Sequence, residues 1–526
     1  MSKIKTGFLF LMILTVVLGI SVSAAAATPD DALVMAASTE IFISLDPAVC
    51  YEVLPSRVVD AVYDQLVGWK NVDESLVIEP ELAEKWEISD DRKTYTFTLR
   101  DANFSNGDPV TAEDAVWSYK RYLKMEKPSV WLLNSIGISK DNMDENIKLI
   151  DKKSFSLTFD KPYAENIILG ILTNNWGSII NKEVALEHEV DGDMGEGWLT
   201  ENSAGAGQYV LDEWERNTKV LLSANEHYYG DEPKLKRVLF RDVPEASTQR
   251  LLLERGDVDV AWDLTPQLLK EMEGTENVDI VTVPAHSNEY LAMNASWGPL
   301  KDRKVRQAIK YAIDYDSIIE DINAGYAIKV QGFIPKGYFG YVDKNPFKRD
   351  LEKARELLVE AGYPDGFKVE ILTNQRETRK AEATLVQSNL NDIGIEAEVT
   401  VMQASQMYAK YREQGHQLIV AGWGNDYADA DNLAMAFTNY DAGQLAYRCA
   451  WKDEKAIKLA EEGRFEPDPE KRKEIYRELT DHWFENGPFA MFYQSVEFWG
   501  VRSELKDFYD SAFGYSMKFD FGGISK

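Results

Sequence analysis

Apolar and polar residues alternate in regular patterns between residues 367 and 421. Every second position is apolar in 367–371 and in 395–401, which predicts two half-buried strands, and 418–421 is a short, fully apolar run typical of a buried strand. The segments between them predict helices that end near Gly394 and Gly415. The apolar face of the first helix consists of Ala381, Leu385, Val386 and Ile393.

This β–α–β–α–β order predicts an α/β domain with a mainly parallel sheet and helices on its faces. Ligands of such sheets bind at the carboxyl ends of the strands, in the crevice where the strand order reverses. The loop 422–432 follows directly after the predicted strand 418–421. It is therefore the first place to look for a binding site.

A second pattern, in 94–123, predicts a strand, a turn and a helix. Tyr95, Phe97 and Leu99 alternate with threonines, which indicates a half-buried strand. The sequence Asn-Gly-Asp-Pro at 106–109 has the composition of a turn. Thr111 and Asp114 have the spacing of a capping box, so a helix is expected to begin there.

The N-terminus has the pattern of an export signal. Lys3 and Lys5 precede an apolar run, 7–20, and small residues fill 21–27. We expect residues 1–27 to be a signal peptide that is cleaved near Ala26 or Ala27. The apolar run is short for a membrane-spanning helix, and no later segment is long and apolar enough to span a membrane.

Composition limits the possible functions of the exported chain. The full chain has 526 residues, which is too long for one core, so two or three domains are expected. It carries 88 acidic and 58 basic residues, a net charge of −30, which argues against nucleic acid and anionic membrane surfaces as partners.

Catalytic and cofactor motifs are missing from the sequence. The five histidines are scattered, with no paired spacing for a metal, and there is no Gly-x-Ser-x-Gly or phosphate-binding loop. Gly205-Ala206-Gly207 lacks the third glycine of a dinucleotide fingerprint. We therefore expect no catalytic residues, no metal and no cofactor, and a protein that is not an enzyme.

The segment 80–121, PELAEKWEISDDRKTYTFTLRDANFSNGDPVTAEDAVWSYKR, resembles the signature region of the extracellular solute-binding proteins of family 5. These are the peptide-, dipeptide- and nickel-binding receptors of bacterial ABC importers. Further similar segments are 203–211, 253–259 and 293–314, so the resemblance covers nearly the whole exported chain. It implies a binding protein and leaves the ligand open.

The resemblance also implies the fold: a periplasmic binding protein-like type II α/β architecture, with two lobes joined by a hinge. Lobe one would comprise 28–288 and 494–526, with an inserted subdomain at about 66–200, and lobe two would comprise 289–493. Cys50 and Cys449 would then belong to different lobes, and a disulfide between them would hinder opening, so we expect two free thiols. Some relatives carry a lipid-attachment cysteine directly after the signal; here the first cysteine is Cys50, so we expect a freely diffusing, monomeric periplasmic protein.

The loop Gly-Trp-Gly-Asn-Asp-Tyr-Ala-Asp-Ala-Asp-Asn at 422–432 resembles the Gly-Trp-x-x-Asp-x-x-Asp-Pro-Asp-Asn segment of peptide and dipeptide receptors. In those receptors the first aspartate binds the α-ammonium of the peptide, and the matching residue here is Asp426. A carboxylate suits this role because charge-assisted hydrogen bonds to an ammonium are strong. Asp429 and Asp431 are expected to be turn and cap residues. Gly422 and Trp423 are expected to line the site.

Dipeptide receptors of the family also have an arginine that binds the α-carboxylate of the ligand. A guanidinium suits this role because it is planar and bidentate. The candidate is Arg376, which follows the predicted strand that ends near Leu372, and Arg379 is its rival. If Arg376 holds a carboxylate, the ligand is short; otherwise longer peptides would fit. Tyr51 and Glu52 belong to a segment that approaches the ligand from lobe one in relatives.

Taken with the resemblance, these observations predict a periplasmic substrate-binding receptor that closes about its hinge around a di- or short oligopeptide. Its partner would be an ABC transporter permease in the inner membrane. Alternatives on the same fold are an oligosaccharide, an opine or a nickel chelate. An extracytoplasmic hydrolase is the alternative of another class, and a chemosensory role would be additional to transport.

Overall fold

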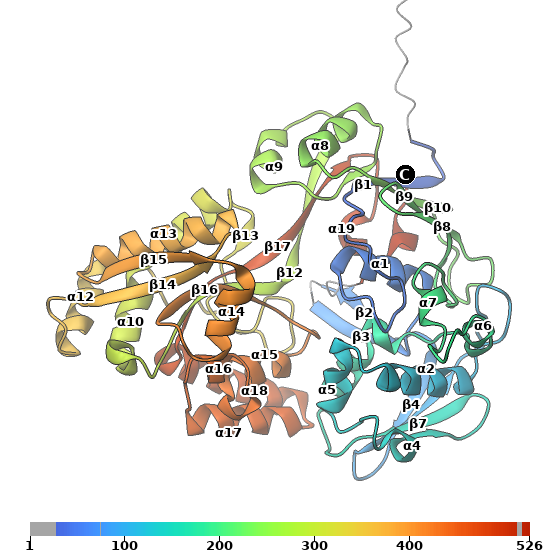
Figure 1. Cartoon of the computed structure of the whole chain (residues 1–526), viewed down its shortest axis with the longest axis horizontal. Helices are drawn as coiled ribbons and strands as arrows, with labels where there is room; N and C mark the ends of the chain where they lie inside the picture. The colour runs from blue at the N-terminus through green and yellow to red at the C-terminus, as the bar shows by residue number, and fades with distance from the viewer. Residues whose placement is uncertain (1–27, 74, 513–517) are drawn as a thin grey trace, which may run out of the picture.

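The computed structural model describes residues 28–73, 75–512 and 518–526, which form two lobes (Figure 1). The lobes are joined by two long antiparallel strands, β12 (Val278–Met293) and β17 (Phe489–Arg502). Their register shifts between Pro284 and Asn288, near the middle of β12. The predicted two-lobed α/β fold is thus confirmed, and the predicted lobe boundaries at 288 and 493 fall inside these two hinge strands.

One sheet of eleven strands passes through both lobes in the described part of the chain. Its order is β15-β14-β16-β12-β17-β11-β1-β10-β9-β8, with β13 (Ala327–Ile328) paired to β17. Lobe one contributes β1 (Ala32–Ala37), β8 (Tyr209–Glu215), β9 (Lys219–Ala224), β10 (Arg237–Asp242) and β11 (Val260–Ala261). The two hinge strands are therefore part of the sheet in both lobes. A bend within these strands can move one lobe relative to the other without disrupting the core of either lobe.

Lobe one carries a subdomain with its own hydrophobic core. Its strands form a hairpin, β2 (Val67–Val72) with β3 (Ser75–Pro80), and a four-stranded sheet, β4 (Ala83–Ile88), β5 (Thr94–Leu99), β7 (Ser154–Thr158) and β6 (Ile147–Leu149). The predicted strand 94–99 is β5. The predicted capping box is present at the start of α2 (Ala112–Met125), where Thr111 and Asp114 bond reciprocally. The sequence could predict this capping box because its two partners are only three residues apart.

The remaining α-helices of lobe one in the described ranges are α1 (Val53–Val62), α3 (Trp131–Asn134), α4 (Met143–Asn146), α5 (Glu165–Leu172), α6 (Lys182–Glu187), α7 (Glu196–Leu199), α8 (Ala246–Arg255), α9 (Pro266–Met272) and α19 (Phe508–Ala512). Those of lobe two, apart from α13 and α14, are α10 (Arg303–Ala312), α11 (Tyr315–Ser317), α12 (Leu351–Glu360), α15 (Ala430–Thr438), α16 (Leu445–Arg448), α17 (Glu454–Phe465) and α18 (Pro469–Asn486).

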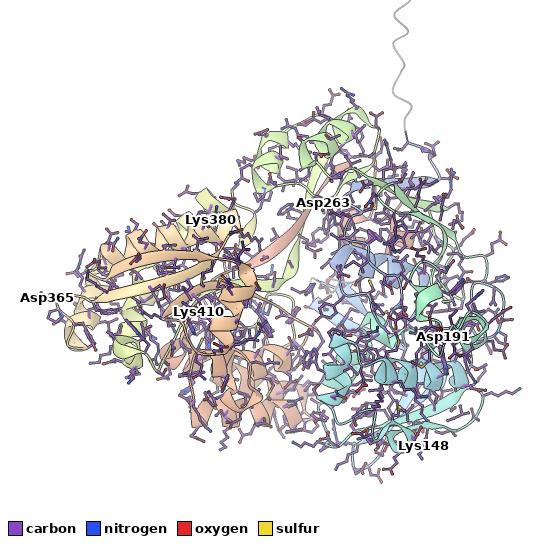
Figure 2. The ribbon with its side chains drawn as sticks, viewed as in Figure 1. Lys148, Asp191, Asp263, Asp365, Lys380 and Lys410 are labelled. Carbon is purple, nitrogen blue, oxygen red and sulfur yellow. The ribbon has the colours of Figure 1, made fainter. Side chains whose placement is uncertain are left out.

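Lobe two contains the predicted β–α–β–α–β unit. It runs through β14 (Lys368–Asn374), α13 (Glu377–Asn391), β15 (Glu396–Met402), α14 (Ala404–Arg412) and β16 (Leu418–Gly424). Both β15 and β16 pair with β14 in parallel, as predicted. The two crossovers run in opposite directions over the sheet, so right-handed connections place α13 and α14 on opposite faces. Figure 2 labels Lys380 on α13 and Lys410 on α14.

Two details of that unit differ from the sequence prediction. Ala381 is exposed, whereas the buried face of α13 includes Arg379 and Glu382. The predicted apolar face was wrong at Ala381 because these charged side chains pack inward against Glu289 of the hinge strand. In addition, β16 continues to Gly424, so Gly422 and Trp423 belong to the strand that pairs with β12 and not to the loop.

Both cysteines are free, as predicted, and both are buried. The predicted signal peptide lies outside the described residues. Within the described ranges, no helix has the length and apolar character needed to cross a membrane.

Candidate ligand-binding cleft

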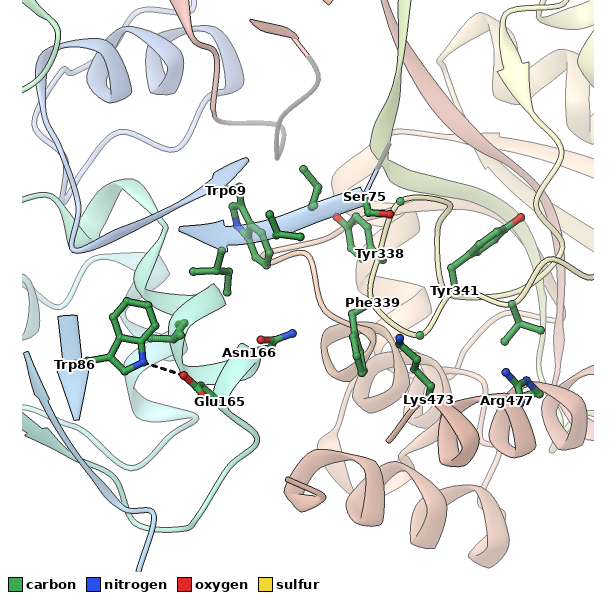
Figure 3. A pocket seen from close by; sticks show the side chains of 17 residues that line it. Trp69, Ser75, Trp86, Glu165, Asn166, Tyr338, Phe339, Tyr341, Lys473 and Arg477 are labelled. Carbon is green, nitrogen blue, oxygen red and sulfur yellow. Dashed lines mark hydrogen bonds between the residues drawn. The ribbon is translucent and has the colours of Figure 1, made fainter. Parts of the chain in front are cut away.

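A cavity of about 660 Å³ lies between the lobes (Figure 3). Lobe one supplies Trp69, Trp86 and the start of α5, where Glu165 accepts a hydrogen bond of 2.8 Å from Nε1 of Trp86. Lobe two supplies the segment 337–342 and two cations of α18, Lys473 and Arg477. The walls therefore combine aromatic surface with a few polar groups, which is the usual composition of a small-molecule site.

Asp426 lies at the contact between the lobes, in the loop after β16. Its Oδ1 accepts a hydrogen bond of 3.1 Å from the hydroxyl of Tyr51, which belongs to lobe one. The side chain of Asn174, also of lobe one, donates to the carbonyl oxygen of Asp426 at 3.1 Å. The next residue, Tyr427, is buried in the core cluster of the subdomain. The loop is thus held by groups from both lobes.

No neighbour among the described residues balances the charge of the Asp426 carboxylate. In the ranges that the structure describes, no lysine, arginine or histidine forms an ion pair with it. Burial raises the pKa of Asp426, although hydrogen bonds from Tyr51 and Asn432 oppose that effect. A partly buried carboxylate that has no cationic partner costs free energy, so the site favours a positively charged ligand group.

Asp429 and Asp431 have structural partners, in agreement with their predicted turn and cap roles. Asp429 caps α15 by accepting from the amide of Asp431, and it forms a buried bidentate pair with Arg472 at 2.7 and 2.6 Å. Asp431 is fully buried in the first turn of α15 and accepts from the hydroxyl of Tyr427 at 2.7 Å. Neither carboxylate is available to a ligand.

The two candidate arginines have different surroundings. Arg379 is buried and forms a bidentate pair with Glu289 at 2.8 and 2.7 Å, and its Nη1 donates to the hydroxyl of Tyr408. Burial alone would lower the pKa of Arg379, but the pairing with Glu289 raises it above its ordinary value. The Arg376 side chain is 60% exposed, and its Nη1 is 3.5 Å from Glu289. Arg376 is therefore the more available of the two.

The other predicted residues occupy several positions around the loop. Gly422 lies against the Arg379–Glu289 pair, because a Cβ there would be 2.5 Å from atoms of both side chains. Trp423 is half-buried, with the Arg448 guanidinium 5.4 Å from its ring centroid. Glu52 precedes α1 and accepts from the amide of Tyr51 at 3.3 Å. Of the predicted residues, the structure brings Tyr51 and Asp426 together, whereas Arg376 belongs to the separate cluster around Glu289.

Several residues that contact Asp426 or Arg376 were missed by sequence reasoning. Asn174 is 252 positions from its partner Asp426, and Glu289 is 87 positions from Arg376. No local sequence pattern could therefore reveal these contacts. The sequence did contain a signal for Asn432, because this residue is the last of the loop motif 422–432 that resembles peptide receptors. Its side chain contacts the backbone amide of Asp426 at 3.3 Å.

A second contact joins the lobes at the end of α17. The carbonyl oxygen of Arg464 accepts a hydrogen bond of 3.0 Å from the amide of Ala164, and the ring of Phe465 lies 5.3 Å from that of Tyr163. Nη2 of Arg464 also donates to the carbonyl oxygen of Ser135 at 3.3 Å. We call this set of contacts the clasp; it holds the lobes together without touching Asp426.

A metal-binding cluster is not present in 28–73, 75–512 and 518–526, where no three His, Cys, Asp or Glu side chains are grouped to hold an ion. The polar side chains that line the cavity carry a carboxylate, an ammonium, a guanidinium, an amide and hydroxyls. This arrangement is suited to reversible binding of a small polar molecule.

Known proteins with similar sequences are binding proteins. The chain is 28% identical to the probable D,D-dipeptide-binding periplasmic protein DdpA of Escherichia coli K12 over 92% of each chain. It is 28% identical to the dipeptide-binding protein of the same organism, over 85% of this chain and 86% of that one. It is 26% identical to the glutathione-binding protein GsiB of Salmonella typhi over the same shares.

Solved structures share the fold over most of the chain. HbpA2 from Haemophilus parasuis matches with a TM-score of 0.82 at 25% identity, over 94% of this chain and 99% of that one. DppA from Helicobacter pylori, solved with the peptide STSA, matches with a TM-score of 0.74 at 25% identity, over 94% and 98%. The family model of the bacterial extracellular solute-binding proteins, family 5, matches residues 77–444. The chain belongs to this family of solute-binding proteins.

Proposed function

We propose that this protein binds the free amino end of a di- or short oligopeptide in the cleft between its lobes. The observation that carries the proposal is Asp426, a partly buried carboxylate at the lobe contact with no cationic partner in the described ranges. An α-ammonium would supply the missing charge, through charge-assisted hydrogen bonds. Relatives named for binding dipeptides and glutathione support a peptide ligand.

Arg376 is the proposed partner of the other end of the ligand. Its guanidinium is largely exposed and only loosely held by Glu289, so a ligand carboxylate can replace that contact. Arg379, the rival, would have to leave a buried bidentate pair, which is costly.

Binding is proposed to drive closure of the lobes, because the ligand would contact both lobes at once and so favour the closed state. The closed receptor would then present its ligand to an ABC transporter permease of the inner membrane. Export to the periplasm is consistent with the expected signal peptide and with the relative named as periplasmic. We propose that the receptor acts as a monomer, without a cofactor or catalytic step.

Native mass spectrometry of the purified protein is the first test, because it identifies whatever is carried in the cleft. A co-purified or exchangeable short peptide is expected. Calorimetry with L-alanyl-L-alanine then compares the wild type with Asp426→Ala. We expect the affinity to fall about tenfold or more, which corresponds to the loss of a charge-assisted hydrogen bond of roughly 1.5–3 kcal/mol.

The matched control is Asp441→Ala, which removes an exposed carboxylate of lobe two that pairs only with Lys452 in the described ranges. Its affinity should equal that of the wild type. Unchanged affinity in Asp426→Ala would refute the assignment of this residue. Recovery of an oligosaccharide, an opine or a nickel chelate in place of a peptide would refute the proposed ligand class.

A further inference from the structure

Arg376 belongs to a cluster of four ionisable side chains, at the place where side chains of α13 meet the hinge strands. Glu289 of β12 accepts two hydrogen bonds from Arg379, and Arg376 approaches it at 3.5 Å. The fourth member, Glu382, lies one turn further along α13 and is fully buried. Gly422 leaves the space that the Arg379–Glu289 pair occupies.

Glu382 has few partners for a buried carboxyl group. The hydroxyl of Tyr493 on β17 donates to its Oε1 at 2.7 Å, whereas Oε2 is buried without a hydrogen-bond partner among the described residues. The charged and titratable groups that face it are Glu289 on β12, Tyr493 on β17, and Arg376 and Arg379 on α13. A neutral carboxyl tolerates this environment better than a carboxylate does.

The pKa of Glu382 is consistent with that geometry. Burial, and then the charge of Glu289, raise it to about 8, while Tyr493 and the two arginines act in the opposite direction. Near neutral pH the cluster therefore holds two guanidiniums, one carboxylate and one neutral carboxyl. This leaves an excess positive charge, and Arg376 is the exposed member that can offer it to the cleft.

We propose that Glu382 is a specificity-determining residue, which in its neutral form keeps Arg376 available for the carboxylate end of the ligand. The inference rests on the proposed peptide function and extends it to a pH response. When Glu382 ionises, its negative charge neutralises the excess and repels an anionic ligand group. The receptor then loses its preference for ligands with a free carboxylate as the pH rises through the pKa of Glu382.

Because proton binding and ligand binding are thermodynamically linked, ligand binding must in turn change the pKa of Glu382. A ligand carboxylate at Arg376 weakens the effect of that guanidinium on Glu382, so binding raises the pKa of Glu382 further. Near that pKa, the complex should therefore take up protons as it forms. The isosteric variant Glu382→Gln mimics the neutral form and should remove this proton uptake.

The test compares L-alanyl-L-alanine with its C-terminal amide by calorimetry. The ratio of the two affinities reports the preference for a carboxylate and largely cancels the titration of the amino group. In the wild type this ratio should fall about tenfold between about pH 6.5 and about pH 9.5, as Glu382 gains its charge. In Glu382→Gln the ratio should equal the low-pH ratio of the wild type and stay constant.

Glu377→Gln is the matched control, because Glu377 is an exposed residue of the same helix that pairs with Lys380. Its affinity ratio should fall with rising pH as that of the wild type does. Tyr493→Phe provides a second variant: its hydroxyl favours the ionised form of Glu382, so its loss should move the pH midpoint upward. The inference would be overturned, and the proposed function left standing, by either of two results. One is an equal fall of the affinity ratio in Glu382→Gln and the wild type; the other is an unchanged pH midpoint of that fall in Tyr493→Phe. Absence of binding by either peptide to the wild type would overturn the proposed function itself.

Discussion

The loop after β16 has two halves with opposite electrostatic surroundings. Asp429 is fully buried, caps α15 and is neutralised by a bidentate pair with Arg472. Asp426 is only partly buried, faces lobe one and has no cationic partner in the described ranges. The difference separates a carboxylate that stabilises the loop from one that we propose binds the ligand.

The same contrast recurs after β14. Arg379 is committed to Glu289 through a buried bidentate pair, whereas Arg376 is exposed and touches Glu289 at a longer distance. In each segment, one charged residue is paired inside the lobe and a neighbouring one faces outward. In the proposed function, these two outward residues, Asp426 and Arg376, would bind the opposite charges at the two ends of a zwitterionic ligand.

The largest expected effect is on stability, from Asp429→Asn. Asparagine can still cap α15, so the variant chiefly removes the charge that neutralises buried Arg472. We expect the free energy of unfolding to fall by about 3–5 kcal/mol. Asp426→Asn should change it by no more than about 0.5 kcal/mol. Urea unfolding of both variants measures the contrast, and equal losses of stability would remove the distinction between the two halves of the loop.

The next effect separates the two arginines. Arg376→Met should lower the affinity for L-alanyl-L-alanine about tenfold and leave its C-terminal amide unaffected, with little change in stability because the side chain is exposed. Arg379→Met should instead destabilise the fold, because it leaves Glu289 buried without its bidentate partner. If Arg379→Met kept its stability and lost the carboxylate preference, the roles of the two arginines would be reversed.

A smaller effect is expected at the clasp, whose contacts include neither Asp426 nor Arg376. Phe465→Ala removes the aromatic contact with Tyr163 across the lobes, worth about 1 kcal/mol. The closed state should become less populated, and the affinity for all peptides should fall about fivefold, whatever their end groups. Calorimetry with free and blocked peptides checks this. A loss confined to one end group would place Phe465 in the binding site instead.

The sequence predicted those parts of the fold whose signals are local. The capping box of Thr111 and Asp114 and the strands 94–99 and 395–401 depend on neighbours within a few residues, and the structure contains all of them. The family resemblance supplied the two lobes and drew attention to Asp426. The strand end was misplaced because β16 pairs with β12 as far as Gly424, which the apolar run alone does not reveal.

The partners that decide which charge is available could not be predicted. Arg472 lies 43 positions after Asp429, and Glu289 lies 90 positions before Arg379. Tyr51 reaches Asp426 across 375 positions. Charged residues in a loop look alike in sequence, and only the folded chain determines which of them are neutralised.

The most direct test of the account measures whether Asp426 senses the amino end of the ligand. L-alanyl-L-alanine and its N-acetylated form are titrated against the wild type and Asp426→Asn. In the wild type, acetylation should cost about tenfold or more in affinity, because the ammonium is lost. In Asp426→Asn, acetylation should make almost no difference. If acetylation costs both proteins equally, the ammonium is bound elsewhere and the central claim is contradicted.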